Sequence, residues 1–158
     1  MTAQTKIVFL TNKRNRSGIL TKFFTGCYAY HSGFLVPSGY FYDMYYMRRR
    51  VKWPYKPYHE SSAIMFDSPV EIPEEYFVHK ILEGVDHYSM MDYALFALRP
   101  LFHLFGKSTR NYNGLICSEQ VNFDLIAHGW KSPWPIKAAP PSPCDLLKHF
   151  SKRSVEVF

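Results

Sequence analysis

The chain has 158 residues and a mass of 18.6 kDa, which is the size of one domain. Hydrophobic residues make up 47% and charged residues 20%, which excludes a disordered or collagen-like chain. Nineteen basic against thirteen acidic side chains give a net charge of +6. This charge favours anionic partners such as phosphates, lipid headgroups, nucleic acid or acidic glycans, without choosing among them.

The first half of the chain predicts strands. Ile7–Leu10 is a short apolar run, and Ile19–Phe24 is expected to form a short helix. The segments Tyr28–Val36 and Tyr40–Met47 are rich in aromatic and β-branched residues. Because the turn signal Pro37-Ser-Gly39 separates them, they predict an antiparallel hairpin.

The second half predicts helices. Ala63–Phe66 is expected to be a last short strand, and Val70–Leu82 mixes strand and helix signals. Met90–Phe105 and Leu115–Gly129 have the content and spacing of helices, the second of them amphipathic, and Asp145–Phe150 predicts one closing helical turn. Strands early and helices late indicate an α+β fold, in a single domain that spans residues 1–158.

Cysteine usage and hydropathy bear on the compartment. Three cysteines, Cys27, Cys117 and Cys144, are too few for a disulfide framework, so we expect at least one free thiol and a cytoplasmic or otherwise reducing compartment. The apolar run Ile7–Leu10 is too short for a signal peptide. Tyr93–Phe105 is too short and too interrupted to span a bilayer. These features predict a soluble protein without a transmembrane segment.

The stretch from Tyr112 to Val121 carries the residue best placed for chemistry. It has the sequence YNGLICSEQV, in which Cys117 follows a turn and opens the predicted helix. Unpaired backbone N–H groups and the positive end of the helix dipole lower the pKa of a thiol there, and the same N–H groups can hold an oxyanion. The stretch therefore indicates a nucleophilic cysteine; the alternative is a small buried core residue.

A nucleophilic cysteine needs a base, usually a histidine, and a third polar group that orients the imidazole ring. His31 lies in the first strand of the predicted hairpin, and Asp43 lies twelve residues later in the second. With the turn near Ser38 and Gly39, the two side chains are expected to be opposite or diagonal, within reach of each other. The alternatives are a packing or surface histidine and a charge at a strand edge.

Three segments together resemble a known family. They are TKFFTGCYAYHSGFL from Thr21, CSEQV from Cys117 and PSPCDLL from Pro141. They are similar to segments of the permuted papain-like amidases, the YiiX-like relatives of the NlpC-type cell-wall peptidases and of lecithin–retinol acyltransferase. The resemblance covers the chain from about Ile7 to Leu147, in the permuted order histidine, polar residue, cysteine. It implies a circularly permuted papain-like (NlpC-type) fold, with an antiparallel sheet packed against helices.

The resemblance also implies an activity, that of a cysteine-dependent amide or ester hydrolase (amidase or peptidase), with acyltransferase chemistry as an alternative. Cys117 takes the position of the nucleophile, His31 that of the base and Asp43 that of the third residue, where relatives often have His or Glu. The implied substrates are peptides, peptidoglycan, and lipid amides or esters. A host or cell-wall target, and a phage-encoded protein that acts in a bacterial host, are compatible with this reading. The segment Arg48–Phe66 does not align with the family, which leaves the substrate open.

Three further residues lie beside the expected triad. Tyr30 and Tyr112 flank the two catalytic segments and are candidates to donate to an oxyanion; the alternative is aromatic packing. Glu119 lies two residues after Cys117. We expect it to support the helix N-terminus electrostatically or to bond nearby backbone, and not to be catalytic.

A basic and aromatic segment supports a second class of function. Arg48, Arg49, Arg50 and Lys52 are followed by Trp53. This patch could bind an anionic partner, namely nucleic acid, a lipid headgroup or a host protein, on a papain-like scaffold that is catalytically idle. The sequence holds no dedicated nucleic-acid motif, and the alternative for this segment is a solvated charged strand edge.

No cofactor or metal is expected. Cys27 and His31 are four residues apart, but on a strand this spacing separates them by about 13 Å. Cys117 and Cys144 have no paired ligands beside them. The chain has neither a P-loop nor a GxGxxG motif. Cys27 and Cys144 are therefore expected to be structural.

Overall fold

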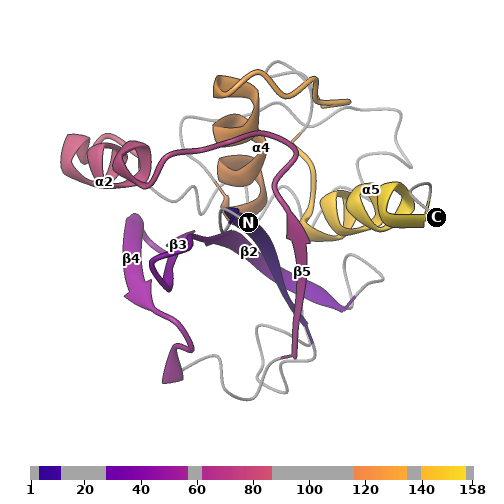
Figure 1. Cartoon of the computed structure of the whole chain (residues 1–158), viewed down its shortest axis with the longest axis horizontal. Helices are drawn as coiled ribbons and strands as arrows, with labels where there is room; N and C mark the ends of the chain where they lie inside the picture. The colour runs from indigo at the N-terminus through magenta and orange to yellow at the C-terminus, as the bar shows by residue number, and fades with distance from the viewer. Residues whose placement is uncertain (1–3, 12–27, 57–61, 87–115, 135–139, 156–158) are drawn as a thin grey trace, which may run out of the picture.

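The computed structural model describes residues 4–11, 28–56, 62–86, 116–134 and 140–155. Within these ranges a five-stranded antiparallel sheet packs against three helices, so the expected α+β class is confirmed (Figure 1). The helices expected at Ile19–Phe24 and Met90–Phe105 lie outside the described residues, as do Cys27 and Tyr112.

The sheet has the strand order β4-β3-β2-β1-β5. Its strands are β1 (Lys6–Thr11), β2 (Ala29–Leu35), β3 (Tyr40–Met44), β4 (Arg48–Lys52) and β5 (Ser62–Asp67). Four of them were expected, and β4 was not. The strand predicted over Tyr40–Met47 ends at Met44, because the chain turns there and the Tyr45 N–H donates to the Met47 carbonyl at 3.2 Å.

The hairpin of β2 and β3 brings the two strands unusually close at Gly33. This residue pairs with Asp43, and a Cβ atom added to it would lie 2.5 Å from the carbonyl oxygen of Tyr42. Such a contact is shorter than real Cβ atoms make, so the approach requires glycine. The turn itself contains Gly39, whose φ of +83° is also typical of glycine.

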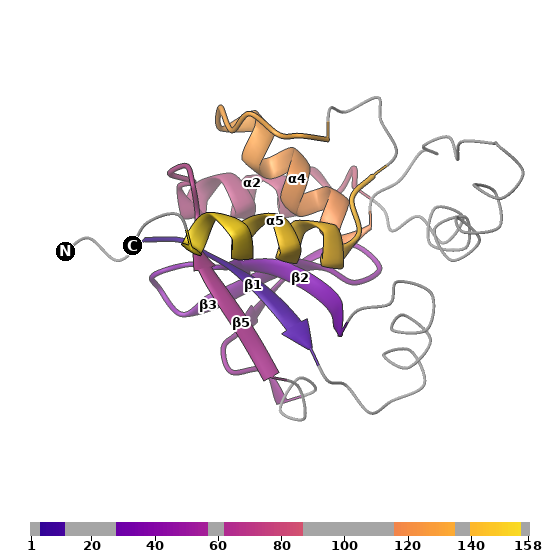
Figure 2. The same cartoon turned by 90° about the vertical axis from the view of Figure 1, so that its right-hand side faces the viewer.

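The helices are α2 (Glu74–Glu83), α4 (Cys117–Ala127) and α5 (Pro143–Val155). Figure 2 shows all three on one side of the sheet. Pro73 precedes α2, and Gly84 ends it with a left-handed φ of +63°. α5 extends over 13 residues instead of the single turn that was expected.

The main core lies between the sheet and the helices. Ile7 and Phe9 of β1 are fully buried there, together with Phe34 of β2, Leu125 of α4 and Leu146 of α5. The alternate residues of β1 belong to a second cluster on the other face of the sheet, whose buried members are Val8, Leu10 and Phe41. β1 is therefore buried on both faces, as a central strand should be.

Candidate active site

The hairpin formed by β2 and β3 holds His31 and Asp43 in direct contact. His31 Nε2 lies 2.8 Å from Asp43 Oδ2, and both residues are buried. Because Gly33 is the direct partner of Asp43, His31 lies diagonally across the two strands from the carboxylate. The contact expected from the hairpin is thus present.

The thiol of Cys117 completes the group from the other end of the chain. Cys117 is the first residue of α4, and its side chain is buried beside Met44 of β3. The sulfur interacts with the His31 ring and with the backbone of Ser32. Since Nε2 of His31 is bound to Asp43, Nδ1 is the ring nitrogen left for the sulfur.

The charges of this group support an ion pair. Burial by itself would lower the pKa of His31, but the adjacent Cys117 thiolate and the Asp43 carboxylate outweigh burial and raise the pKa to about 10. Burial would likewise raise the pKa of Cys117, but the positive imidazolium and the hydrogen bonds from His31 and Ser32 lower it below its usual value of 9.0. A thiolate beside an imidazolium is the arrangement that activates a cysteine nucleophile.

The carboxylate of Asp43 has a second partner, which sequence reasoning missed. Arg49 lies directly opposite it on β4 and donates two hydrogen bonds, from Nε to Oδ1 at 2.7 Å and from Nη2 to Oδ2 at 2.9 Å. Burial would raise the pKa of Asp43, but His31 and Arg49 together hold it well below its usual range. Asp43 is therefore a fixed anion between two cationic groups.

A second buried aspartate holds the helix that carries the thiol. Asp124 of α4 accepts two hydrogen bonds from Arg48, at 2.8 and 2.9 Å, and a third from the Tyr76 hydroxyl at 2.9 Å. Arg48 also binds Asp86. At the start of the same helix, Ser118 donates to the Pro141 carbonyl at 2.7 Å. These bonds link α4 to β4, α2 and the segment before α5.

Helix α4 is buried almost all round, so the expectation of an amphipathic helix is wrong. Its polar residues Gln120, Asn122 and Asp124 are as buried as Val121 and Leu125. The burial of Asn122 and Asp124 is compensated by hydrogen bonds, for example from the Asn122 amide to the Trp134 carbonyl at 3.0 Å. A helix fixed on every side gives Cys117 a defined position.

The predicted basic patch does not form as one exposed surface. Successive strand residues point to opposite faces, so the run of arginines on β4 is divided between them. Arg48 is buried on Asp124 and Asp86, and Arg49 is bound to Asp43. Of the five residues named for the patch, Arg50 and Lys52 are exposed and Trp53 is half-buried against Phe41. Arg50 lies over the Tyr40 ring, 3.6 Å from its centroid.

The supporting residues are placed as follows. The ring of Tyr30 is half-buried and stacks on His31, with 6.4 Å between the ring centroids. Glu119 is buried in the first turn of α4. Tyr112 lies outside the described residues.

The cysteines differ in state. Cys117 is a free thiol, which confirms the expectation of at least one. Cys144, near the start of α5, is disulfide-bonded. The cysteine count did not predict this bond, and it is at odds with the expected reducing compartment, because disulfides persist mainly in oxidising environments.

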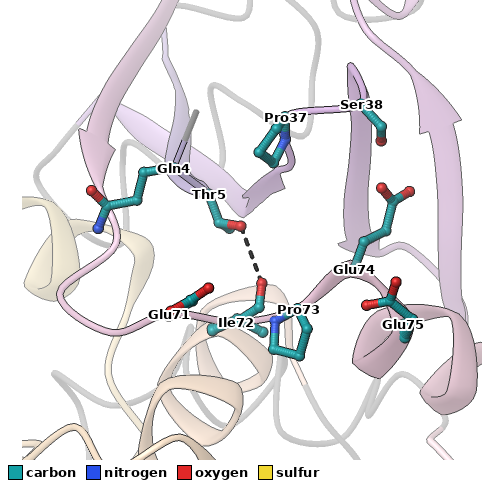
Figure 3. A pocket seen from close by; sticks show the side chains of 9 residues that line it. All are labelled: Gln4, Thr5, Pro37, Ser38, Glu71, Ile72, Pro73, Glu74 and Glu75. Atoms are coloured by element: carbon teal, nitrogen blue, oxygen red, sulfur yellow. Dashed lines mark hydrogen bonds between the residues drawn. The ribbon is translucent and has the colours of Figure 1, made fainter. Parts of the chain in front are cut away.

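A hollow of about 540 Å³ lies away from this site (Figure 3). Its wall includes Thr5, which hydrogen-bonds the Ile72 carbonyl at 3.2 Å, and the acidic residues Glu71, Glu74 and Glu75. None of Cys117, His31 and Asp43 lines it. The hollow and the buried triad are therefore separate features of the molecule.

Comparisons with family models, with curated proteins and with solved structures find no match to this chain. Within the described ranges, no helix combines the length and the apolar character needed to cross a bilayer. The same part of the chain contains no group of three or more His, Cys, Asp or Glu residues arranged to hold a metal ion.

Proposed function

We propose that the protein is a cysteine hydrolase that cleaves an amide or ester bond with a Cys117–His31–Asp43 triad. The observation that carries the proposal is the meeting of three side chains from distant parts of the chain: a free thiol at a helix start, an imidazole and a buried carboxylate. A packing histidine or a core cysteine would not require this combination of contacts.

The proposed fold is the permuted papain-like one. The support is the order of the site residues along the chain, with His31 and Asp43 on a hairpin that precedes the cysteine helix. An antiparallel sheet with helices on one face and the thiol at the opening of α4 is consistent with it. The proposed substrates are those of such enzymes: a peptide, peptidoglycan, or a lipid amide or ester.

In the first proposed step, the Cys117 thiolate attacks the carbonyl carbon of the substrate. A carbon–sulfur bond forms, and the carbonyl electron pair moves to oxygen. Backbone N–H groups in the first turn of α4 have no acceptor within the helix, and Ile116, which precedes it, supplies no side-chain cap. They are suited to bind the oxyanion.

In the second step, the His31 imidazolium gives its proton to the leaving nitrogen or oxygen as the carbon–heteroatom bond breaks. This leaves a thioester on Cys117 and a neutral imidazole. Neutral His31 then takes a proton from water, the hydroxide attacks the thioester, and the Cys117 thiolate departs with its electron pair. Another nucleophile in place of water would give acyl transfer. Asp43 keeps the ring oriented throughout.

The first test uses the thiol directly. Native protein is treated at pH 6 with iodoacetamide and, separately, with p-nitrophenyl acetate. Wild type is expected to lose its free thiol faster than a denatured sample, and to release a burst of one equivalent of p-nitrophenolate, because an acyl-enzyme accumulates. Cys117→Ala should abolish both signals.

The matched control is His31→Ala, which keeps the thiol but removes its partner. It should react with iodoacetamide at pH 6 at the rate of an ordinary thiol and give no burst. Equal rates for wild type, His31→Ala and a denatured sample would contradict the proposal.

A further inference from the structure

The contact between Arg49 and Asp43 is as well formed as the contact between Asp43 and His31. Each oxygen of the carboxylate accepts a hydrogen bond from the guanidinium, at 2.7 and 2.9 Å, and one of them also binds His31 at 2.8 Å. A planar guanidinium that binds both oxygens fixes the rotation of the carboxylate as well as its charge.

The guanidinium is itself held in place. Arg49 lies directly across the β3–β4 ladder from Asp43. Its charged group lies over the rings of Tyr45 and Tyr55, 4.5 and 5.2 Å from their centroids, and its side chain is 24% exposed. The strand pairing and the two rings restrict Arg49 to the position from which it reaches the carboxylate.

We propose that Arg49 is a positioning residue of the reaction, which acts through Asp43 on the His31 ring and so on the Cys117 thiolate. This inference rests on the proposed function. A carboxylate with one partner can rotate and draw the imidazole with it, whereas one bound at both oxygens cannot.

The arginines of β4 supply a matched control. Arg50 is the next residue on the strand and carries the same charge, but its guanidinium lies over Tyr40 and 3.6 Å from Glu74, on the opposite face. Arg49→Gln and Arg50→Gln therefore remove the same charge from adjacent positions. Only the first of them removes a contact to the triad.

The experiment measures the rate of Cys117 alkylation by iodoacetamide from pH 4 to 9, on variants whose folding is checked by thermal melting. The acid limb of this profile is the pH range in which the rate falls because the thiolate becomes protonated. Arg49→Gln should move the midpoint of the acid limb up by about one pH unit, so that alkylation at a pH below the limb is about tenfold slower than in wild type. Arg50→Gln should reproduce the wild-type limb, and Arg49→Lys, which keeps the charge but not both bonds, should fall between.

A double variant separates positioning from a purely structural role. If Arg49 acts through Asp43, then Arg49→Gln should add no further loss of alkylation once Asp43→Asn is present. Independent, additive losses would overturn the proposal, and so would an Arg49→Gln limb that coincides with that of wild type. If Arg49→Gln does not fold, Arg49→Lys carries the test: a raised limb supports the proposal and an unchanged limb overturns it.

The two proposals fail in different ways. If wild type itself alkylates like an ordinary thiol at every pH, the proposed function fails. If wild type shows the low acid limb and Arg49 does not influence it, the function stands and the positioning role is overturned.

Discussion

Two buried aspartates of this molecule are bound to arginine in the same way but differ in their third partner. Asp43 and Asp124 are both fully buried, and each accepts two hydrogen bonds from one of two adjacent arginines of β4. The remaining contacts distinguish them. Asp43 also binds His31, whose ring meets a thiol, whereas Asp124 binds the hydroxyl of Tyr76.

On the proposed function, the third partner decides whether the same kind of ion pair serves catalysis or holds the fold together. At Asp43 that partner is a titratable ring beside a nucleophile, so a change there should appear in reactivity. At Asp124 the partners are Arg48 and Tyr76, which join α4 to β4 and α2. A change there should appear in the free energy of unfolding.

The largest expected effect is on activity and tests the role of Asp43. Asp43→Asn should lower the steady-state rate of p-nitrophenyl ester hydrolysis by about 10⁴-fold, the loss found when a triad aspartate becomes asparagine and the ring takes the wrong tautomer. The asparagine amide would also face the Arg49 guanidinium, donor against donor. The rate is measured well below the melting temperature, and a loss below about tenfold would show that Asp43 does not orient the ring.

The next largest effect is on stability and tests the role of Asp124. Asp124→Ala should lower the free energy of unfolding by about 3–5 kcal/mol, because it leaves the buried Arg48 charge without its main partner. Urea denaturation measures the loss. Asp67→Ala, which breaks the exposed pair with Lys6, is the control and should cost less than about 1 kcal/mol. Similar losses for both variants would contradict the assignment.

The shifted pKa values of His31 and Cys117 predict how activity depends on pH. The pKa of His31 is raised to about 10, so the imidazolium and the stability it contributes are fully present below pH 6.5 and are lost as the pH rises through about 10. Because the pKa of Cys117 is lowered, its thiolate is still present below pH 9.0. The thiolate is lost only when the pH falls through that lowered pKa. Ester hydrolysis should therefore follow a bell-shaped profile, and outside it the rate should change by about tenfold per pH unit.

A profile that rises steadily through pH 9 and does not fall near pH 10 would indicate an ordinary thiol without an imidazolium partner.

The smallest effect refines the comparison. Tyr76→Phe removes the hydroxyl that donates to Asp124 and leaves the Arg48 contact intact. It should cost about 1 kcal/mol in urea denaturation, the net value of one hydrogen bond, and leave the alkylation profile of Cys117 unchanged. A shifted profile would show that the two aspartates are coupled through α4.

The sequence was sufficient for the hairpin of β2 and β3 because its signals are local. Two aromatic segments around a Pro-Ser-Gly turn predict two paired strands, and pairing brings His31 and Asp43 within reach of each other whatever the rest of the chain does. The start of α4 at Cys117 was also predictable, from a turn followed by helical spacing.

The partners of Arg48 and Arg49 are harder to predict from the sequence. The run of basic residues favours a single charged surface that includes Arg48 and Arg49, because the sequence alone does not show that β4 pairs with β3 and divides its side chains between two faces. A signal was present: Asp43 and Arg49 are six residues apart around a polar and aromatic turn, which suits a direct cross-strand pair of opposite charge. The partnership of Arg48 with Asp124 spans 76 residues and depends on tertiary packing that no local pattern specifies.

The run of three arginines on β4 also affects how that strand finds its register. If β4 slipped by one residue so that Arg50 stood opposite Asp43, Arg49 would take the place of Arg48 at Asp124, so charge pairing alone scarcely distinguishes the two alignments. Val51 does distinguish them. It pairs with Phe41 and packs against the cluster of Val8 and Leu10, where this slip would insert Lys52. The packing of Val51 thus decides which arginine pairs with Asp43 and which pairs with Asp124.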